Sequence, residues 1–144
     1  MESISLSRIL AYWAERQPDA AAITHEGRTL SWTEFEARSN RLARAYADCG
    51  VEADDFVTIA LPNGIGFFEA TFATWKLGAT PQPVSAKLPA AELGRLLEVG
   101  QPTLVVGVDA AAHPLANTLP ADFEADPALS DAPLPERTDR KSVV

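Results

Sequence analysis

The stretch Phe56-Val-Thr-Ile-Ala-Leu-Pro-Asn-Gly-Ile-Gly-Phe-Phe-Glu-Ala70 decides the fold class. Its β-branched and apolar start predicts a strand over 56–61, and after the Pro62–Gly64 turn signal a helix is expected over about 65–77. That helix is apolar nearly all round, so it is expected to be buried on more than one side. A second apolar strand is predicted at 103–107. Apolar strands separated by helical crossovers predict an α/β fold, with a layered, mostly parallel sheet and flanking helices.

A short helix and a hairpin are predicted before this unit. Ser5 or Ser7 can cap the first helix, and Pro18 ends it. Residues 21–32 contain two extended runs around Glu26-Gly27, where glycine can supply a positive φ. This pattern is typical of a β-hairpin.

Two further helices are predicted on either side of the strand at 56–61. Thr33 and Glu36 have the spacing of a capping box, and the helix that they open is expected to stop at Gly50. Pro89 is expected to begin a later helix, which Gly100 ends. The residues of that helix expected to face inward are Leu93, Leu96 and Leu97.

Residues 79–85 include Pro81 and Pro83, which favour a link or a short edge strand.

The composition of the chain changes after residue 108. Residues 109–144 hold five prolines and eight alanines, and their seven acids face three bases, so this segment can bury little apolar surface. We therefore expect a first α/β subdomain over 1–108 and an extended, partly mobile tail or linker over 109–144.

Charge and cysteine content exclude several classes of function. The formal net charge of −8 would repel a phosphate backbone, so nucleic acid is not expected as a partner. Cys49 is the single cysteine and is expected to be a small packed residue, so neither a disulfide framework nor a cysteine metal site is predicted. The first residues have no basic patch followed by an apolar run, so a signal peptide is not expected, and no window approaches the roughly 20 apolar residues of a membrane span. A cytoplasmic location is expected.

The glycine-bearing turn after the first strand raises the question of a nucleotide-binding loop. The dinucleotide fingerprint is G-x-G-x-x-G, and Gly64 and Gly66 match its first two places, but Glu69 stands at the third. A carboxylate near the helix start would also occupy the positive end of the helix dipole. We therefore predict an ordinary strand-to-helix turn that holds no nucleotide phosphate, although strand ends in α/β sheets often border ligand crevices.

The remaining candidate residues suggest no catalytic or metal site. His25 beside the hairpin turn and His113 in the tail are expected to be solvated side chains. Lys76 is expected to extend its ammonium group from the helix end into water rather than to contact a substrate. Trp75 is expected in the core. Catalytic and metal-binding residues are thus predicted to be absent from this chain, and its cofactor-binding residues are unknown.

Three stretches of the sequence match motifs of a known family. Leu30-Ser-Trp-Thr-Glu-Phe35 is similar to a start motif, L-T/S-Y-x-E-L. Asn40-Arg-Leu-Ala43, Gly50-Val51 and Asp54 then lead into Val57-Thr-Ile-Ala-Leu-Pro-Asn63. Trp75-Lys-Leu-Gly-Ala-Thr-Pro-Gln-Pro-Val84 resembles a second motif, hydrophobic-K-A-G-A-x-x-x-P. Together these stretches resemble adenylate-forming ligases, the superfamily of acyl-CoA synthetases, luciferases and nonribosomal-peptide adenylation domains. The resemblance covers about residues 5–108, and the order and spacing of the stretches make it specific.

The resemblance implies a fragment of a longer enzyme of the acyl-CoA synthetase type. The phosphate loop ending in Pro-Lys, the later motifs for ribose and Mg²⁺ and a C-terminal-domain lysine are not in this sequence. The complete enzyme would join a fatty, steroid or bile-acid-like carboxylic acid to ATP with Mg²⁺ and pass the acyl group to coenzyme A. A second copy of the chain is one candidate partner.

The resemblance also leaves alternatives. The closest is an adenylation domain that loads a carrier protein. A free-standing, non-catalytic α/β module that binds a partner and a small nucleotide-binding domain are the others. The fragment alone is expected to be inactive and to bind none of ATP, Mg²⁺ and CoA.

Overall fold

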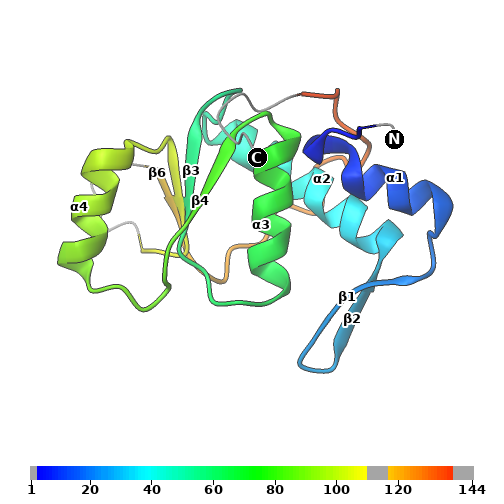
Figure 1. Cartoon of the computed structure of the whole chain (residues 1–144), viewed down its shortest axis with the longest axis horizontal. Helices are drawn as coiled ribbons and strands as arrows, with labels where there is room; N and C mark the ends of the chain where they lie inside the picture. Colours follow the sequence, from blue (N-terminus) through cyan, green and yellow to red (C-terminus); the bar gives the residue numbers. More distant parts are fainter. Residues whose placement is uncertain (1–2, 110–116, 138–144) are drawn as a thin grey trace.

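The computed structural model describes residues 3–109 and 117–137 and confirms the predicted α/β class (Figure 1). Helices and strands alternate along the chain, with a hairpin near the N-terminus. The elements are η1 (Leu6–Arg8), α1 (Ile9–Arg16), β1 (Ala21–His25), β2 (Arg28–Ser31), α2 (Trp32–Asp48), β3 (Phe56–Ile59), α3 (Ile65–Lys76), β4 (Thr80–Pro83), α4 (Ala90–Gly100), β5 (Leu104–Val106) and β6 (Asn117–Leu119).

The central sheet is parallel throughout, with the strand order β4-β3-β5-β6. In its register Val57 of β3 is paired with Pro81 of β4 on one side and with Leu104 of β5 on the other. β4 is an edge strand, as its prolines predict, because proline has no N–H to donate to a further strand. The β6 strand was not predicted, and it pairs with β5 from Leu104↔Asn117 onward.

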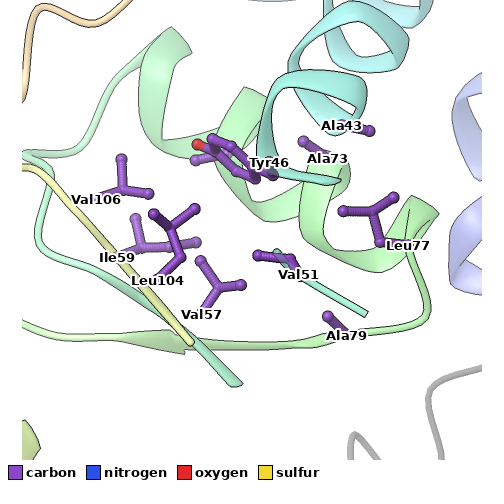
Figure 2. Close-up of a cluster of buried hydrophobic side chains, with 11 residues drawn as sticks. Ala43, Tyr46, Val51, Val57, Ile59, Ala73, Leu77, Ala79, Leu104 and Val106 are labelled. Carbon is purple, nitrogen blue, oxygen red and sulfur yellow. The ribbon is translucent and has the colours of Figure 1, made fainter. Parts of the chain in front are cut away.

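The main core lies between the sheet and the helices α2 and α3. Figure 2 shows Val57, Ile59 and Leu104 from the strands pointing toward Tyr46 of α2 and Ala73 of α3. These side chains are buried, and apolar residues at alternate positions of β3 face the same side of the sheet. The packing explains why α3 is apolar nearly all round, since the sheet and α2 both contact it.

Helix α4 covers the opposite face of the sheet. In Figure 1 the strands lie between α4 and α3. Thr58, which alternates with Val57 along β3, donates a hydrogen bond of 3.2 Å to the side-chain oxygen of Gln82. A Cβ added at Gly100 of α4 would meet that same Gln82 oxygen at 3.1 Å, so the C-terminal end of α4 lies directly over β4.

Caps and turns confirm the predicted helices and correct their details. Ser5 caps η1 by accepting a hydrogen bond from the Ser7 N–H, and the hairpin turn has positive φ at Glu26 and Gly27. The capping box is formed by Ser31 and Glu34, so the prediction of Thr33 and Glu36 was wrong by two residues. The cause is the hairpin, because β2 runs to Ser31 and leaves it extended at the helix start, with φ −71° and ψ 167°.

Two apolar side chains were predicted in the wrong environment. Trp75 is only partly buried, and its ring packs edge-to-face on Phe72 with centroids 5.2 Å apart. Leu96 of α4 was expected to face inward but is 47% exposed. Helix α4 also runs one residue further than predicted, since Gln101, not Gly100, adopts the left-handed conformation that ends it.

The described part of the tail, residues 117–137, is largely irregular, yet it lies against the rest of the fold. It contains β6, and Leu119 and Leu134 pack on the main core. Arg44 of α2 donates hydrogen bonds to the carbonyls of Ser130 and Ala132, at 2.9 and 2.6 Å. The expectation of a segment that buries little is wrong for these leucines. The domain boundary at residue 108 and the mobility of the tail stay predictions.

Candidate functional site

The carboxyl ends of β3 and β4 border a groove of about 440 Å3. Its walls come from residues 61–63 after β3, from 83–87 after β4, and from Phe67 in the first turn of α3. The chain leaves β3 toward α3 on one face and leaves β4 toward α4 on the other. The groove therefore lies at the carboxyl edge of the parallel sheet, one strand away from the switch point, because the strand order reverses between β3 and β5.

The floor and the rim of this groove differ in polarity. Leu61, Phe67 and Val84 are half-buried, whereas Asn63 and Lys87 are exposed. Ser85, also exposed, accepts a hydrogen bond of 3.2 Å from the Lys87 N–H, which turns the chain after β4. The groove can thus receive an apolar group under a polar rim, but these residues include no nucleophile paired with a base.

Behind the groove, α2 and α3 are joined by a bidentate ion pair. Arg38 Nε donates to Glu69 Oε2 at 2.6 Å, and Arg38 Nη2 donates to Glu69 Oε1 at 3.3 Å. The hydrogen bond to Glu69 is the main reason that the pKa of Arg38 is raised. Glu69 is buried against α2, so the expectation that its carboxylate occupies the positive end of the α3 dipole was wrong.

A second ion pair lies nearly out of water, at the last residue of α3. Lys76 Nζ donates to Glu36 Oε2 at 2.6 Å, and the two side chains are 5% and 11% exposed. Burial lowers the pKa of Lys76, while Glu36 acts in the opposite direction. The prediction of a solvated helix-end lysine was wrong, because α2 covers the end of α3 and offers a carboxylate there.

Asn40 extends this second pair to the tail. Its amide nitrogen donates to Glu36 Oε1 and to the backbone oxygen of Asp131, both at 3.0 Å. Its next neighbour Arg41 donates from Nε to the backbone oxygen of Leu129 at 3.2 Å. The sequence analysis did not predict these contacts. The i, i+1 and i+4 spacing of Asn40, Arg41 and Arg44 puts the three polar side chains on one flank of the helix, and this pattern could have indicated a surface that binds another segment.

A smaller pocket of about 110 Å3 lies between α2, α3 and the tail. Arg38, Arg41 and Glu69 supply its charges, and Phe123 and Glu124 close it from the tail side. Tyr46 also lines it, and burial raises the pKa of that phenol well above its usual value. Because its arginines are already bound to Glu69 and to the tail, this pocket offers no free cation for a ligand.

The structure does not assemble the other candidate residues into a site. Gly64 and Gly66 lie at the start of α3, and a Cβ at Gly64 would touch the His25 ring at 3.4 Å, so the hairpin lies against this turn. Cys49 is partly buried, and its burial raises its pKa. His113 lies outside the described residues. Within residues 3–109 and 117–137, no group of three histidines, cysteines or acids could hold a metal ion.

Comparison with known proteins identifies the family to which this chain is similar. The AMP-binding enzyme family matches residues 10–143. The chain is 35% identical over 127 residues to the salicyl-AMP ligase / salicyl-S-ArCP synthetase of Mycobacterium tuberculosis (strain ATCC 25618 / H37Rv), covering 82% of this chain and 22% of that protein. It is 33% identical over 120 residues to a dimodular nonribosomal peptide synthase of Bacillus subtilis (strain 168), covering 82% of this chain and 5% of that protein.

Among solved structures, the chain is similar to the AMPPNP-bound form of the nonribosomal peptide synthetase FmoA3. The TM-score is 0.82 at 23% identity, over 94% of this chain and 15% of that one. The chain thus spans about a fifth or less of the length of each of these three proteins. Among the helices that the structure describes, none is both long and apolar enough to cross a membrane. With a family match that takes in both ion pairs and the whole central sheet, the chain belongs to the AMP-binding enzyme family, the adenylate-forming ligases.

Proposed function

We propose that residues 1–144 form the N-terminal part of an ATP-dependent ligase that converts a carboxylic acid to its acyl-adenylate, releasing pyrophosphate, and then transfers the acyl group to a thiol. The observation that carries this proposal is the family match over residues 10–143, which includes the whole described sheet. Adenylation is chemically required, because a carboxylate is a poor electrophile until one of its oxygens bonds to the α-phosphorus of ATP with loss of pyrophosphate, so that AMP can leave when the thiol attacks the acyl carbon.

The described residues of this chain do not fit Mg²⁺-ATP by themselves. Their acids form no cluster for a metal, and the buried Glu69 and Lys76 each neutralise a partner from α2. In the proposed enzyme these residues hold α3 against α2 and so keep the groove at the strand ends in shape. Residues beyond this segment supply the groups that bind and polarise the nucleotide.

For the acceptor thiol, we propose a carrier protein. The salicyl-S-ArCP synthetase and the nonribosomal peptide synthase are the relatives that support this choice, at 35% and 33% identity. Coenzyme A is the competing acceptor, supported by the resemblance of the Trp75–Val84 stretch to ligases that act on fatty, steroid or bile-acid-like acids. For the acid, the salicyl-AMP ligase supports an aromatic acid over a fatty, steroid or bile-acid-like one. The cytoplasmic location stays a prediction.

The test uses the protein that carries residues 1–144 together with the polypeptide encoded after them. Pyrophosphate release is measured with ATP, Mg²⁺ and a panel of aromatic, amino, fatty and steroidal acids. The acceptor is then varied between CoA and a phosphopantetheine-bearing carrier protein. We expect acid-dependent release and acyl transfer to the carrier. An enzyme inert with every acid, or a gene that ends at Val144, would favour a non-catalytic partner-binding module.

A further inference from the structure

The pocket of about 110 Å3 between α2, α3 and the tail lies at the switch point of the parallel sheet. The strand order reverses between β3 and β5, and the pocket is lined by Leu61, which follows β3, and by Val106, the last residue of β5. In open α/β sheets, ligands bind in the crevice that the strand ends form at such a point. This space is called the switch-point pocket below.

A buried hydroxyl in the switch-point pocket lacks a hydrogen-bond partner among residues 3–109 and 117–137. Tyr46 is 1% exposed and lines the pocket. Burial and then the charge of Glu69 raise the pKa of its phenol, and no hydrogen bond contributes. Figure 2 shows the Tyr46 oxygen pointing away from Leu77 and toward the side of the core that holds Val106. Because buried hydroxyls are normally hydrogen-bonded, this one is available to a molecule in the pocket.

The lining of the pocket favours a neutral molecule that carries a hydroxyl. Its charges cancel, since two arginines and two glutamates contribute to it, namely Arg38, Arg41, Glu69 and Glu124. A ligand hydroxyl can accept a hydrogen bond from Tyr46 and donate one to Glu69, whose carboxylate keeps free lone pairs beside its bonds to Arg38.

The size and the apolar wall of the pocket favour a single ring. The volume of about 110 Å3 is somewhat less than the roughly 150 Å3 of an apolar cavity that holds benzene, and this pocket also opens to solvent. A ring can therefore enter and lie against the apolar side chains, which are Leu42, Leu61, Val106 and Phe123.

We propose that the switch-point pocket binds a neutral, single-ring phenol, with its ring on the apolar wall and its hydroxyl bonded to Tyr46. Phe123 and Glu124 close the pocket from the tail side, so the ligand contacts the tail as well as α2 and α3. The pocket lies beside the groove at the ends of β3 and β4 and shares Leu61 with it. The proposed ligase function does not require this second site.

The test is a titration of phenol, toluene and benzoate into the 144-residue chain, followed by amide chemical shifts. Toluene has the shape of phenol without its hydroxyl, and benzoate carries a charge. We expect phenol to shift the Gly66 and Phe123 amides saturably, with a dissociation constant on the order of 1 mM, and the other two compounds to bind at least about threefold more weakly. Tyr46→Phe should weaken phenol binding roughly three- to tenfold and abolish its advantage over toluene, because one hydrogen bond is lost while the ring stays.

A matched pair of variants locates the site. Gly66→Leu and Gly94→Leu both place a side chain on a helix where an added Cβ meets no atom within 4 Å. Gly66 lines the pocket and Gly94 does not, so only Gly66→Leu should abolish phenol binding, and thermal unfolding verifies that both variants fold.

Several results would overturn the site. They are the absence of any saturable shift with phenol, toluene or benzoate binding as tightly as phenol, unchanged phenol affinity in Gly66→Leu or in Tyr46→Phe, and shifts confined to residues 84–87 of the groove. None of these readouts involves catalysis, so their outcome is independent of the proposed function.

Discussion

Lys76 Nζ lies 2.6 Å from Glu36 Oε2 at the buried contact between α3 and α2, and Asn40 links the same carboxylate to the tail. Three segments distant in sequence thus meet at one charged pair. Because the pair is nearly free of water, each charge depends on the other for its stabilisation. Lys76, which the sequence suggested to be a solvated lysine, is instead buried in an ion pair that joins α3 to α2.

Removing one member of this pair should destabilise the protein strongly. Lys76→Met or Glu36→Gln should each lower the free energy of unfolding by roughly 3–5 kcal/mol, because the remaining group stays buried without its partner. The double change to Met and Leu should recover much of this loss. Denaturant unfolding measures all three. The control is Glu136→Gln, which breaks the half-exposed pair with Arg8 and should cost about 0–1 kcal/mol. Single variants as stable as that control would contradict the account.

The buried phenol of Tyr46 predicts a loss of stability at high pH. Burial raises the pKa of Tyr46 above its ordinary 10.0, so in the folded state it keeps its proton while the unfolded chain loses it. The folded state then binds more protons, and the free energy of unfolding falls as pH rises above about 10. Tyr46→Phe should remove this component. Unfolding is measured from pH 8 to 11.5 for both proteins, and parallel curves would argue against the buried position.

Gly107 should be irreplaceable at the end of β5. Its φ of +101° is unfavourable for other residues, and an added Cβ would overlap the carbonyl oxygen of Ala60 beside it. Gly107→Ala should therefore destabilise the protein by about 3 kcal/mol or more. Gly94→Ala is the matched control, because that helical glycine has free space around its Cα and its replacement should stabilise by roughly 0.5–1 kcal/mol. Equal unfolding midpoints for the two variants would show that β3 and β5 are paired differently.

The tail should be released by a single change in α2. Arg44 donates hydrogen bonds to the backbone carbonyls of Ser130 and Ala132. Because Arg44→Ala removes these bonds, it should increase proteolytic cleavage within residues 126–134 several-fold. Arg95→Ala on the exposed side of α4 serves as the control. Cleavage sites are located by mass spectrometry at early times. A tail cleaved equally fast in the parent, the control and the variant would restore the simpler prediction of a detached linker.

Local patterns predicted the elements well, whereas pairings between distant segments escaped them. The period of the apolar residues predicted β3, α3 and β5, because each follows from its own side chains. The role of Lys76 could not be predicted in this way, since it depends on Glu36, which lies 40 positions away. β6 was missed for a related reason, because Asn117–Leu119 is too short and polar to predict a strand without β5 beside it.

The candidate site shows the same limit. The turn at Pro62–Gly64 was predicted from its residues, but the groove is formed only when β4 lies beside β3, which brings Val84–Lys87 to the same edge. Residue types alone also placed Glu69 at a helix start exposed to ligands. In the structure Arg38 binds it, and no local pattern links the two positions.

The measurement that tests the central claim most directly is acid-dependent exchange of pyrophosphate into ATP by two proteins. Residues 1–144 alone should show none, because the sequence predicts no residue in this segment that would position and stabilise the transferring adenylyl group. The chimera in which this segment replaces the aligned part of the salicyl-AMP ligase should exchange pyrophosphate with salicylate. Exchange by residues 1–144 alone, or a folded chimera without exchange, would contradict the claim that this chain is scaffold for an adenylate-forming site.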